Sequence, residues 1–223
     1  GKLVPQNYLN VLKKTENEST AKKTKTTKTI HGIEKQTTKE TADQIQQGIA
    51  KEILRFHVLA NSDSEEDQKL KLEVKDRLVD YMKDILDGAE DVKETKKRIT
   101  ENQETICLVA EQEIQKQGYT YPVSVNLEKC YFPMKTYGDC TFPAGTYEAL
   151  RVCIGKAKGR NWWCVLYPGL CFADSVNVIV PDEKKEELKN ILTEEEYESL
   201  FDWREDDYQI RSGFLRLWRK LFA

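Results

Sequence analysis

The sequence predicts an α+β fold in which helices pack on one face of a mixed or antiparallel sheet, with a disordered N-terminal arm and a helical C-terminal tail. Within residues 49–180 the apolar residues follow a strand pattern, then a helical pattern, then a strand pattern again. The chain on either side is polar and rich in charge. We therefore divide it into a low-complexity Lys/Thr-rich linker at 1–48, an α+β domain at 49–180 and an acidic, then basic-amphipathic helical tail at 181–223.

The arm at residues 1–48 has the composition of a linker. It holds nine lysines against five acids, and its stretch AKKTKTTKT at residues 21–29 is of low complexity. Such a segment cannot bury enough apolar surface to offset the conformational entropy lost on ordering. We interpret the arm as a tether; a Lys-rich arm that contacts an anionic lipid or a wall polymer is the alternative.

The first strand and its helix cap are predicted next along the chain. EILRFHVLA at residues 52–60 is rich in branched and aromatic residues, as strands are. The polar run Asn-Ser-Asp-Ser that follows ends the strand. Ser64 with Asp67 three residues later fits a capping box, so a helix is expected to begin there.

Two helical regions follow this cap. The first ends at Gly88, and its apolar face is formed by Leu70, Val74, Leu78, Tyr81, Met82 and Ile85. The second covers about residues 91–117 and stops at Gly118. Each helical region is expected to pack on the sheet through its apolar face.

Three strands complete the predicted domain. Apolar and polar residues alternate at residues 123–127 and again at 147–154, as in half-buried strands. GKAKGR at residues 155–160 is interpreted as a hairpin loop, and residues 161–166 as the return strand. We therefore expect the last two strands to be neighbours.

The tail changes character twice. Residues 181–207 are acidic and predict one or two short exposed helices, whereas residues 208–223 form an amphipathic, basic pattern. This last segment either packs on the core or lies on a membrane surface. In the membrane case the contacting residues would be Phe214, Leu217, Trp218 and Leu221.

Composition and motifs indicate no catalytic or metal chemistry. The net charge is −3, which does not favour nucleic acid as a partner. Only two histidines are present and no C-x-x-C spacing occurs, so we predict no metal. No catalytic or phosphate-binding motif is found, and we predict no enzyme activity and no cofactor. His57 could serve as a general base or as the partner of a thiol, but a packed strand histidine is the favoured interpretation.

The six cysteines suggest disulfides and hence export. Fifteen pairings exist for six cysteines. Turns between them suggest the pairs Cys164–Cys171 and Cys130–Cys140 and, for the remaining two, Cys107–Cys153. No apolar run approaches the roughly 20 residues that span a bilayer. Because the chain starts with Gly-Lys, we expect a mature form from which a signal sequence was removed.

Two adjacent tryptophans mark the segment NWWCVLYPGLCF at residues 161–172. On a strand, Trp162 and Trp163 point to opposite faces. One is expected in the core. The other is either covered by the tail or exposed as an anchor for a partner.

Several segments together resemble the stage II sporulation protein R family. They are residues 54–76, which contain ANSDS, and residues 132–172, which contain FPAGTYEALR and NWWCV. The resemblance covers about residues 49–176 and, less closely, the basic-aromatic tail. Cys164 and Cys171 match the family pattern; the other four cysteines look like additions, and the arm is longer than the family leads us to expect.

The resemblance implies a function that the residues alone do not. Members of this family are exported signalling proteins of endospore-forming bacteria, made in the forespore. They act between forespore and mother cell, where they activate a membrane-embedded aspartic protease that processes the precursor of sigma-E. A hydrolase or cell-wall-binding module in the same space is the alternative. The residues expected to touch the protease are Phe132, Tyr137, Phe142, Trp162 and Trp163.

Overall fold

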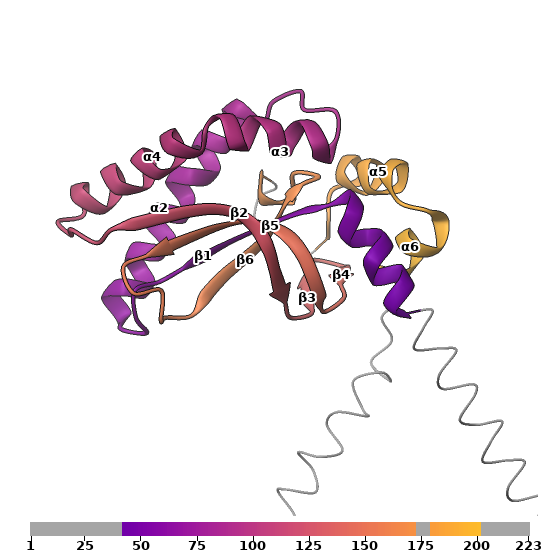
Figure 1. The fold of residues 1–223 in the computed structure, drawn as a ribbon. Helices are drawn as coiled ribbons and strands as arrows, with labels where there is room; N and C mark the ends of the chain where they lie inside the picture. The colour runs from indigo at the N-terminus through magenta and orange to yellow at the C-terminus, as the bar shows by residue number, and fades with distance from the viewer. Residues whose placement is uncertain (1–41, 173–178, 202–223) are drawn as a thin grey trace, which may run out of the picture. The chain divides into compact units, whose positions relative to one another are not determined.

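The computed structural model describes residues 42–172 and 179–201 of the chain. Its labelled elements are β1 (Leu54–Leu59), α2 (Glu65–Ile85), α3 (Val92–Glu101), α4 (Gln103–Lys116), β2 (Val123–Phe132), β3 (Lys135–Tyr137), β4 (Cys140–Phe142), β5 (Gly145–Ile154), β6 (Asn161–Tyr167), the 3-10 helix η1 (Leu170–Phe172), α5 (Asp182–Ile191) and α6 (Glu194–Ser199). A further helix at residues 42–52 precedes β1. Four strands form one mixed sheet in the order β2-β5-β1-β6, and β3 pairs with β4 (Figure 1).

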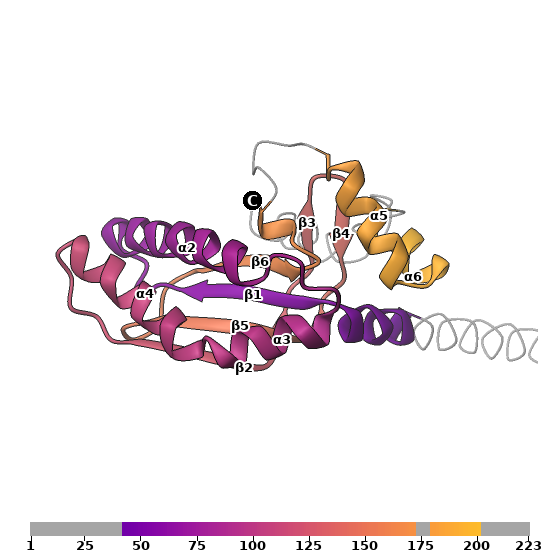
Figure 2. The same ribbon diagram turned by 90° about the horizontal axis from the view of Figure 1, so that it is seen from above.

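The predicted α+β class is confirmed. Helices α2, α3 and α4 cover one face of the mixed sheet, which we call the helix face (Figure 2). Residues 1–41 of the predicted disordered arm and the amphipathic end of the tail, including the four residues proposed to touch a membrane, lie outside the described residues. Residues 42–48, which the prediction placed in the arm, are described and form part of the 42–52 helix.

The first core lies between the helix face and these three helices. The strands contribute side chains that alternate along each strand, including Phe56 and Val58 of β1 and Val152 of β5. Helix α2 contributes the buried residues Leu70, Val74, Leu78 and Met82, so the apolar face predicted for this helix is the face that packs.

The start of α2 follows from its cap. The Ser64 side chain accepts a hydrogen bond from the Asp67 backbone N–H at 3.2 Å, as predicted. The Asp67 carboxylate does not complete a capping box, because it accepts instead from Asn61 Nδ2 at 2.8 Å and Ser62 Oγ at 2.5 Å. These bonds fix the turn between β1 and α2.

The second predicted helical region is two helices. The break falls at Asn102, whose side-chain amide donates to the Arg98 carbonyl at 2.8 Å and whose Oδ1 accepts from the Tyr81 hydroxyl at 3.2 Å. This break bends the chain so that α3 and α4 both pack on the sheet. Gly118, at φ +85°, ends the region as predicted.

The predicted hairpin between β5 and β6 is wrong. Strand β1 lies between them, parallel to β5 and antiparallel to β6. The loop at residues 155–160 instead crosses the end of β1, where Lys158 and Gly159 donate backbone hydrogen bonds to Asn61 and Ala60. A Cβ at Gly159 would clash with the Ser62 carbonyl oxygen, so the loop needs glycine there. All six β1 residues are buried, as expected for a central strand that is covered on both faces.

A second core covers part of the other sheet face, which we call the second face. Ile49 lies in the 42–52 helix, Ile53 directly follows it, and β4 adds Cys140 and Phe142. Leu188 lies in α5, and Leu192 and Leu200 directly follow α5 and α6. The two short acidic helices that the sequence predicts do form, but these three leucines are buried in the second core. The boundaries drawn at residues 48 and 180 stay predictions; elements that pack on this core lie on both sides of them.

Candidate functional site

The second face of the sheet carries polar side chains in a cross-strand row. His57 on β1 pairs with Arg151 on β5 and with Trp163 on β6, and Arg151 pairs with Asn126 on β2. Side chains alternate along β1, so Arg55 and His57 point to the second face while their neighbours fill the first core.

His57 is buried and lies between an indole and a thiol. Its side chain is 4% exposed. The imidazole stacks on Trp163, with ring centroids 4.9 Å apart and planes at 15°, and lies 5.2 Å from the Phe132 ring. Its Nε2 is 3.6 Å from Cys130 Sγ. Among the described residues, its Nδ1 has no hydrogen-bond partner.

The electrostatics of this site keep His57 neutral. The pKa of His57 is lowered from 6.5 to about 4; burial is the largest cause, the charge of Arg151 also lowers it, and the charge of Glu128 opposes them. Glu128 is itself paired with Arg151, at 2.7 Å between Oε1 and Nη1. At neutral pH the imidazole is therefore uncharged.

Cys130 is a poor nucleophile in this setting. Burial, followed by the charge of Glu128, raises the pKa of the Cys130 thiol, and Arg151 only partly opposes this. A reactive cysteine needs a lowered pKa, usually beside a protonated histidine. Here the thiol pKa is raised and the histidine pKa is lowered, so the contact joins two neutral groups.

Arg55 is the least expected residue of the second face. It is fully buried, and its guanidinium lies over four aromatic rings, at 4.6 Å from Phe132, 5.2 Å from Phe142 and Tyr147, and 5.6 Å from Tyr137. One nitrogen donates to the Tyr137 hydroxyl at 3.1 Å. Its Nε and Nη1 have no hydrogen-bond partner among the described residues. The rings, through cation–π contacts, take the place of a counterion.

The five residues predicted to touch a partner do not form one surface. Phe132 and Phe142 are fully buried around Arg55 and serve the second core. Burial also raises the pKa of Tyr137, whose hydroxyl is used by Arg55. Contact with a partner stays a prediction for these residues.

The two tryptophans lie on opposite faces, as predicted. Trp162 packs on the helix face, edge-on to Phe56 at 5.5 Å, with Lys75 Nζ 5.2 Å from its ring. Trp163 packs on the second face against His57 and Phe132. Both are half-buried, so both are partly structural, and partner contact stays a prediction for each.

All six cysteines are free thiols in the structure, and the three predicted pairings stay predictions. Cys164 and Cys171 are close: burial and a hydrogen bond between them raise the pKa of Cys171. Cys140 belongs to the second core, and Cys130 packs against that core. The third predicted pair, Cys107 and Cys153, lies on opposite sides of the sheet. Cys107 packs on the first core, whereas Cys153 alternates on β5 with residues of that core and so points to the second face.

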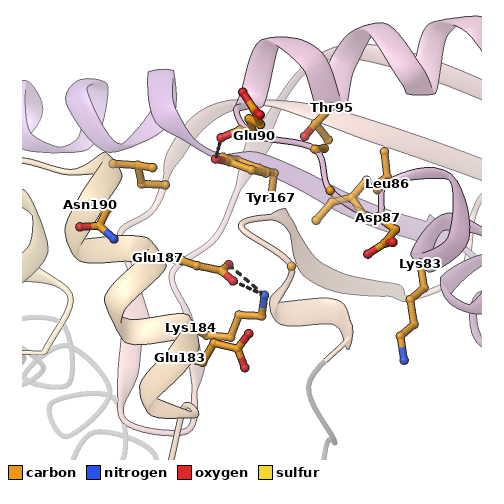
Figure 3. Close-up of a pocket in the computed structure, with 15 residues that line it drawn as sticks. Lys83, Leu86, Asp87, Glu90, Thr95, Tyr167, Glu183, Lys184, Glu187 and Asn190 are labelled. Atoms are coloured by element: carbon orange, nitrogen blue, oxygen red, sulfur yellow. Dashed lines mark hydrogen bonds and ion pairs between the residues drawn. The ribbon is translucent and has the colours of Figure 1, made fainter.

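A cleft of about 680 Å³ lies between the α2–α3 junction, the end of β6 and α5 (Figure 3). Two contacts within the protein join polar groups of its lining. The Tyr167 hydroxyl donates to the Glu90 carbonyl at 2.9 Å, and Lys184 Nζ pairs with Glu187 at 2.6 Å. Sequence reasoning missed this cleft because its walls come from elements far apart in the chain.

Sequence reasoning also missed Arg55 and the Cys130–His57 contact. The available signal was the alternation of basic and apolar residues in LRFHVL, which puts two ionisable side chains on one face of a strand otherwise typical of a core. Within residues 42–172 and 179–201, no group of three His, Cys, Asp or Glu residues could hold a metal ion. Over the same residues, no helix combines the length and the hydropathy that a bilayer crossing requires.

Comparison with known proteins gives one consistent result. The family described as stage II sporulation protein R matches residues 50–177, which include the whole mixed sheet and α2 to α4. The stage II sporulation protein R of Bacillus subtilis (strain 168) is 35% identical over 164 residues, which cover 71% of each chain. No solved structure matches. The chain therefore belongs to the stage II sporulation protein R family.

Proposed function

We propose that this protein is a secreted, non-enzymatic signal that acts between forespore and mother cell and activates a membrane-embedded aspartic protease, which then processes the precursor of sigma-E. The observation that carries the proposal is the family match over residues 50–177. A ligand activates its target only if it binds the active state more tightly than the inactive one. The protein must therefore present a surface that distinguishes the two states of the protease.

Trp163 is the best placed of the predicted contact residues. It is half-buried on the second face, and Lys135 Nζ lies 5.9 Å from its ring, so an aromatic and a cationic group are adjacent there. Aromatic side chains of this kind often dominate the energy of an interface. The stack on His57 holds the indole in one orientation, which lowers the entropy lost on binding.

A thiol hydrolase is the second candidate, since Cys130 Sγ and His57 Nε2 are 3.6 Å apart. A nucleophile and a base within reach of each other are the minimum for such chemistry. The opposite pKa shifts of the two groups count against it, because they disfavour the thiolate–imidazolium pair. We therefore favour the signalling role.

The test is cleavage of the sigma-E precursor in cells that contain the protease but lack this protein. Secreted full-length protein should restore cleavage, and Cys130→Ala should restore it equally, because a signal needs no nucleophile. Cys107→Ala is the matched control, as its thiol is half-buried on the other side of the sheet.

Two results would contradict the proposal in different ways. If the wild-type protein did not restore cleavage, the signalling role would be wrong. If Cys130→Ala alone abolished cleavage while its thermal unfolding stayed cooperative, the thiol hydrolase would replace it.

A further inference from the structure

Strand β2 is an edge of the mixed sheet, and its hydrogen-bonding groups alternate in direction. The Pro122 carbonyl accepts from the Gly155 N–H at 2.8 Å, and these two residues continue the register in which Val123 faces Ile154. In an antiparallel pair, every second residue bonds to the neighbouring strand. Even-numbered β2 residues therefore bond to β5, and odd-numbered residues direct their N–H and C=O groups away from the sheet.

Helix α4 covers the first half of this edge. The Gln103 side-chain amide donates to the Val125 carbonyl at 2.7 Å, and the Cys107 thiol donates to the Val123 carbonyl at 3.6 Å. No hydrogen bond from a described residue reaches the outward groups of Leu127, Lys129 or Tyr131. We call residues 127–131 the free edge.

The side chains of the free edge are suited to contact. Tyr131 is 64% exposed, one of few large apolar side chains so exposed among the described residues. Lys129 is exposed and forms no ion pair with a described residue, since Glu148, which lies opposite it on β5, pairs with Lys96. Behind the edge, Cys130 touches His57, which stacks on Trp163, so packed side chains connect the free edge to the second face.

The positive charge of Lys129 decides which kind of strand can pair with the free edge. Two copies of β2 pairing antiparallel about the centre of the free edge would place Lys129 opposite Lys129, and like charges directly opposed destabilise a strand pair. Lysine on an edge strand is a usual defence against self-association. A strand with a carboxylate at that position would turn the same lysine into an attractive contact.

We propose that an extended segment of the partner adds to the sheet at the free edge, with an acidic side chain opposite Lys129 and an apolar one opposite Tyr131. Main-chain hydrogen bonds to the three outward residues supply affinity, and these side chains supply specificity. This inference rests on the proposed function, so the segment belongs to the extracytoplasmic part of the protease.

The test uses proline to remove one outward N–H. Lys129→Pro deletes an outward donor and leaves the bonds to β5 intact, a position where edge strands tolerate proline. Val123→Pro is the matched control, because it makes the same change in the half that α4 covers. Binding of the full-length protein to detergent-solubilised protease should weaken about tenfold or more for Lys129→Pro and stay unchanged for Val123→Pro.

Two further variants at Lys129 keep the backbone N–H, so they test the contact even if the proline variant fails to fold. Lys129→Glu keeps the N–H and reverses the charge, and it should also weaken binding, whereas Lys129→Thr should have the smaller effect of losing the ion pair alone. Slow amide exchange along β5 reports an intact sheet in every variant.

The outcomes separate this inference from the proposed function. If wild-type protein binds and activates the protease but Lys129→Pro and Lys129→Glu do so equally well, the free edge is not the docking site and the signalling role stands. If wild-type protein does not bind the protease, both are wrong. Self-association of the wild-type protein through β2, seen as a dimer that Lys129→Pro abolishes, would also overturn the inference.

Discussion

The two faces of the central sheet are equally buried along β1 but differ in chemistry. The helix face takes Leu54, Phe56 and Val58, all fully buried, into an apolar core. The second face takes Arg55 and His57, which are buried as deeply but have polar atoms without hydrogen-bond partners among the described residues. Burial of apolar area stabilises a fold, whereas burial of unsatisfied polar groups costs free energy. The helix face therefore provides stability, and the second face is where a functional reason for the residues should be sought.

The largest test of this contrast is Phe56→Ala on the helix face. The change removes a ring that is fully buried and that contacts Trp162, so the free energy of unfolding should fall by about 3–5 kcal/mol. Urea denaturation measures this. Leu72→Ala is the control, since Leu72 is 44% exposed and should change stability by less than about 1 kcal/mol. Equal effects would mean that the first core is not where the stability lies.

The second face should respond to pH through His57. Its folded pKa, about 4, lies below the 6.5 of the unfolded chain, so between these values only the unfolded state takes up the proton. Stability is therefore complete above pH 6.5 and should fall by about 3 kcal/mol as the pH drops to 4. The measurement is the unfolding free energy of wild type minus that of His57→Phe across this range. A difference that does not change with pH would contradict the burial of a neutral imidazole.

Arg55→Met on the second face should raise stability, whereas Phe56→Ala on the helix face should lower it. It replaces a buried guanidinium by an apolar side chain within the same four rings, so the protein should gain roughly 1–3 kcal/mol of stability. Denaturation in urea again gives the value. A loss of more than about 1 kcal/mol would show that the cation–π contacts outweigh the cost of burying the charge.

The smallest expected effect concerns the turn between β1 and α2. Ser64→Ala removes the cap of α2 and should cost about 1 kcal/mol. Ser124→Ala is the control, because Ser124 is exposed on β2. If both substitutions left the melting temperature unchanged, the Ser64 hydrogen bond would contribute nothing to the start of the helix.

The features predicted correctly from the sequence are those that residues close together in the chain determine. The cap at Ser64, the apolar face of α2 and the opposite directions of Trp162 and Trp163 all depend on short-range periodicity. The order of the strands does not, since β1 pairs with strands about a hundred residues further along the chain. The Cys130–His57 contact depends on that order and could not be predicted before it was known.

The adjacent tryptophans give the most direct test of the claim that the faces divide stability from recognition. Trp162→Ala and Trp163→Ala would be compared for both unfolding free energy and precursor cleavage in cells that hold the protease. We predict that Trp162→Ala loses mainly stability and still activates cleavage, whereas Trp163→Ala, despite folding, loses about tenfold or more in activation. If both variants lost activation only in proportion to their loss of stability, the division between the two faces would be contradicted.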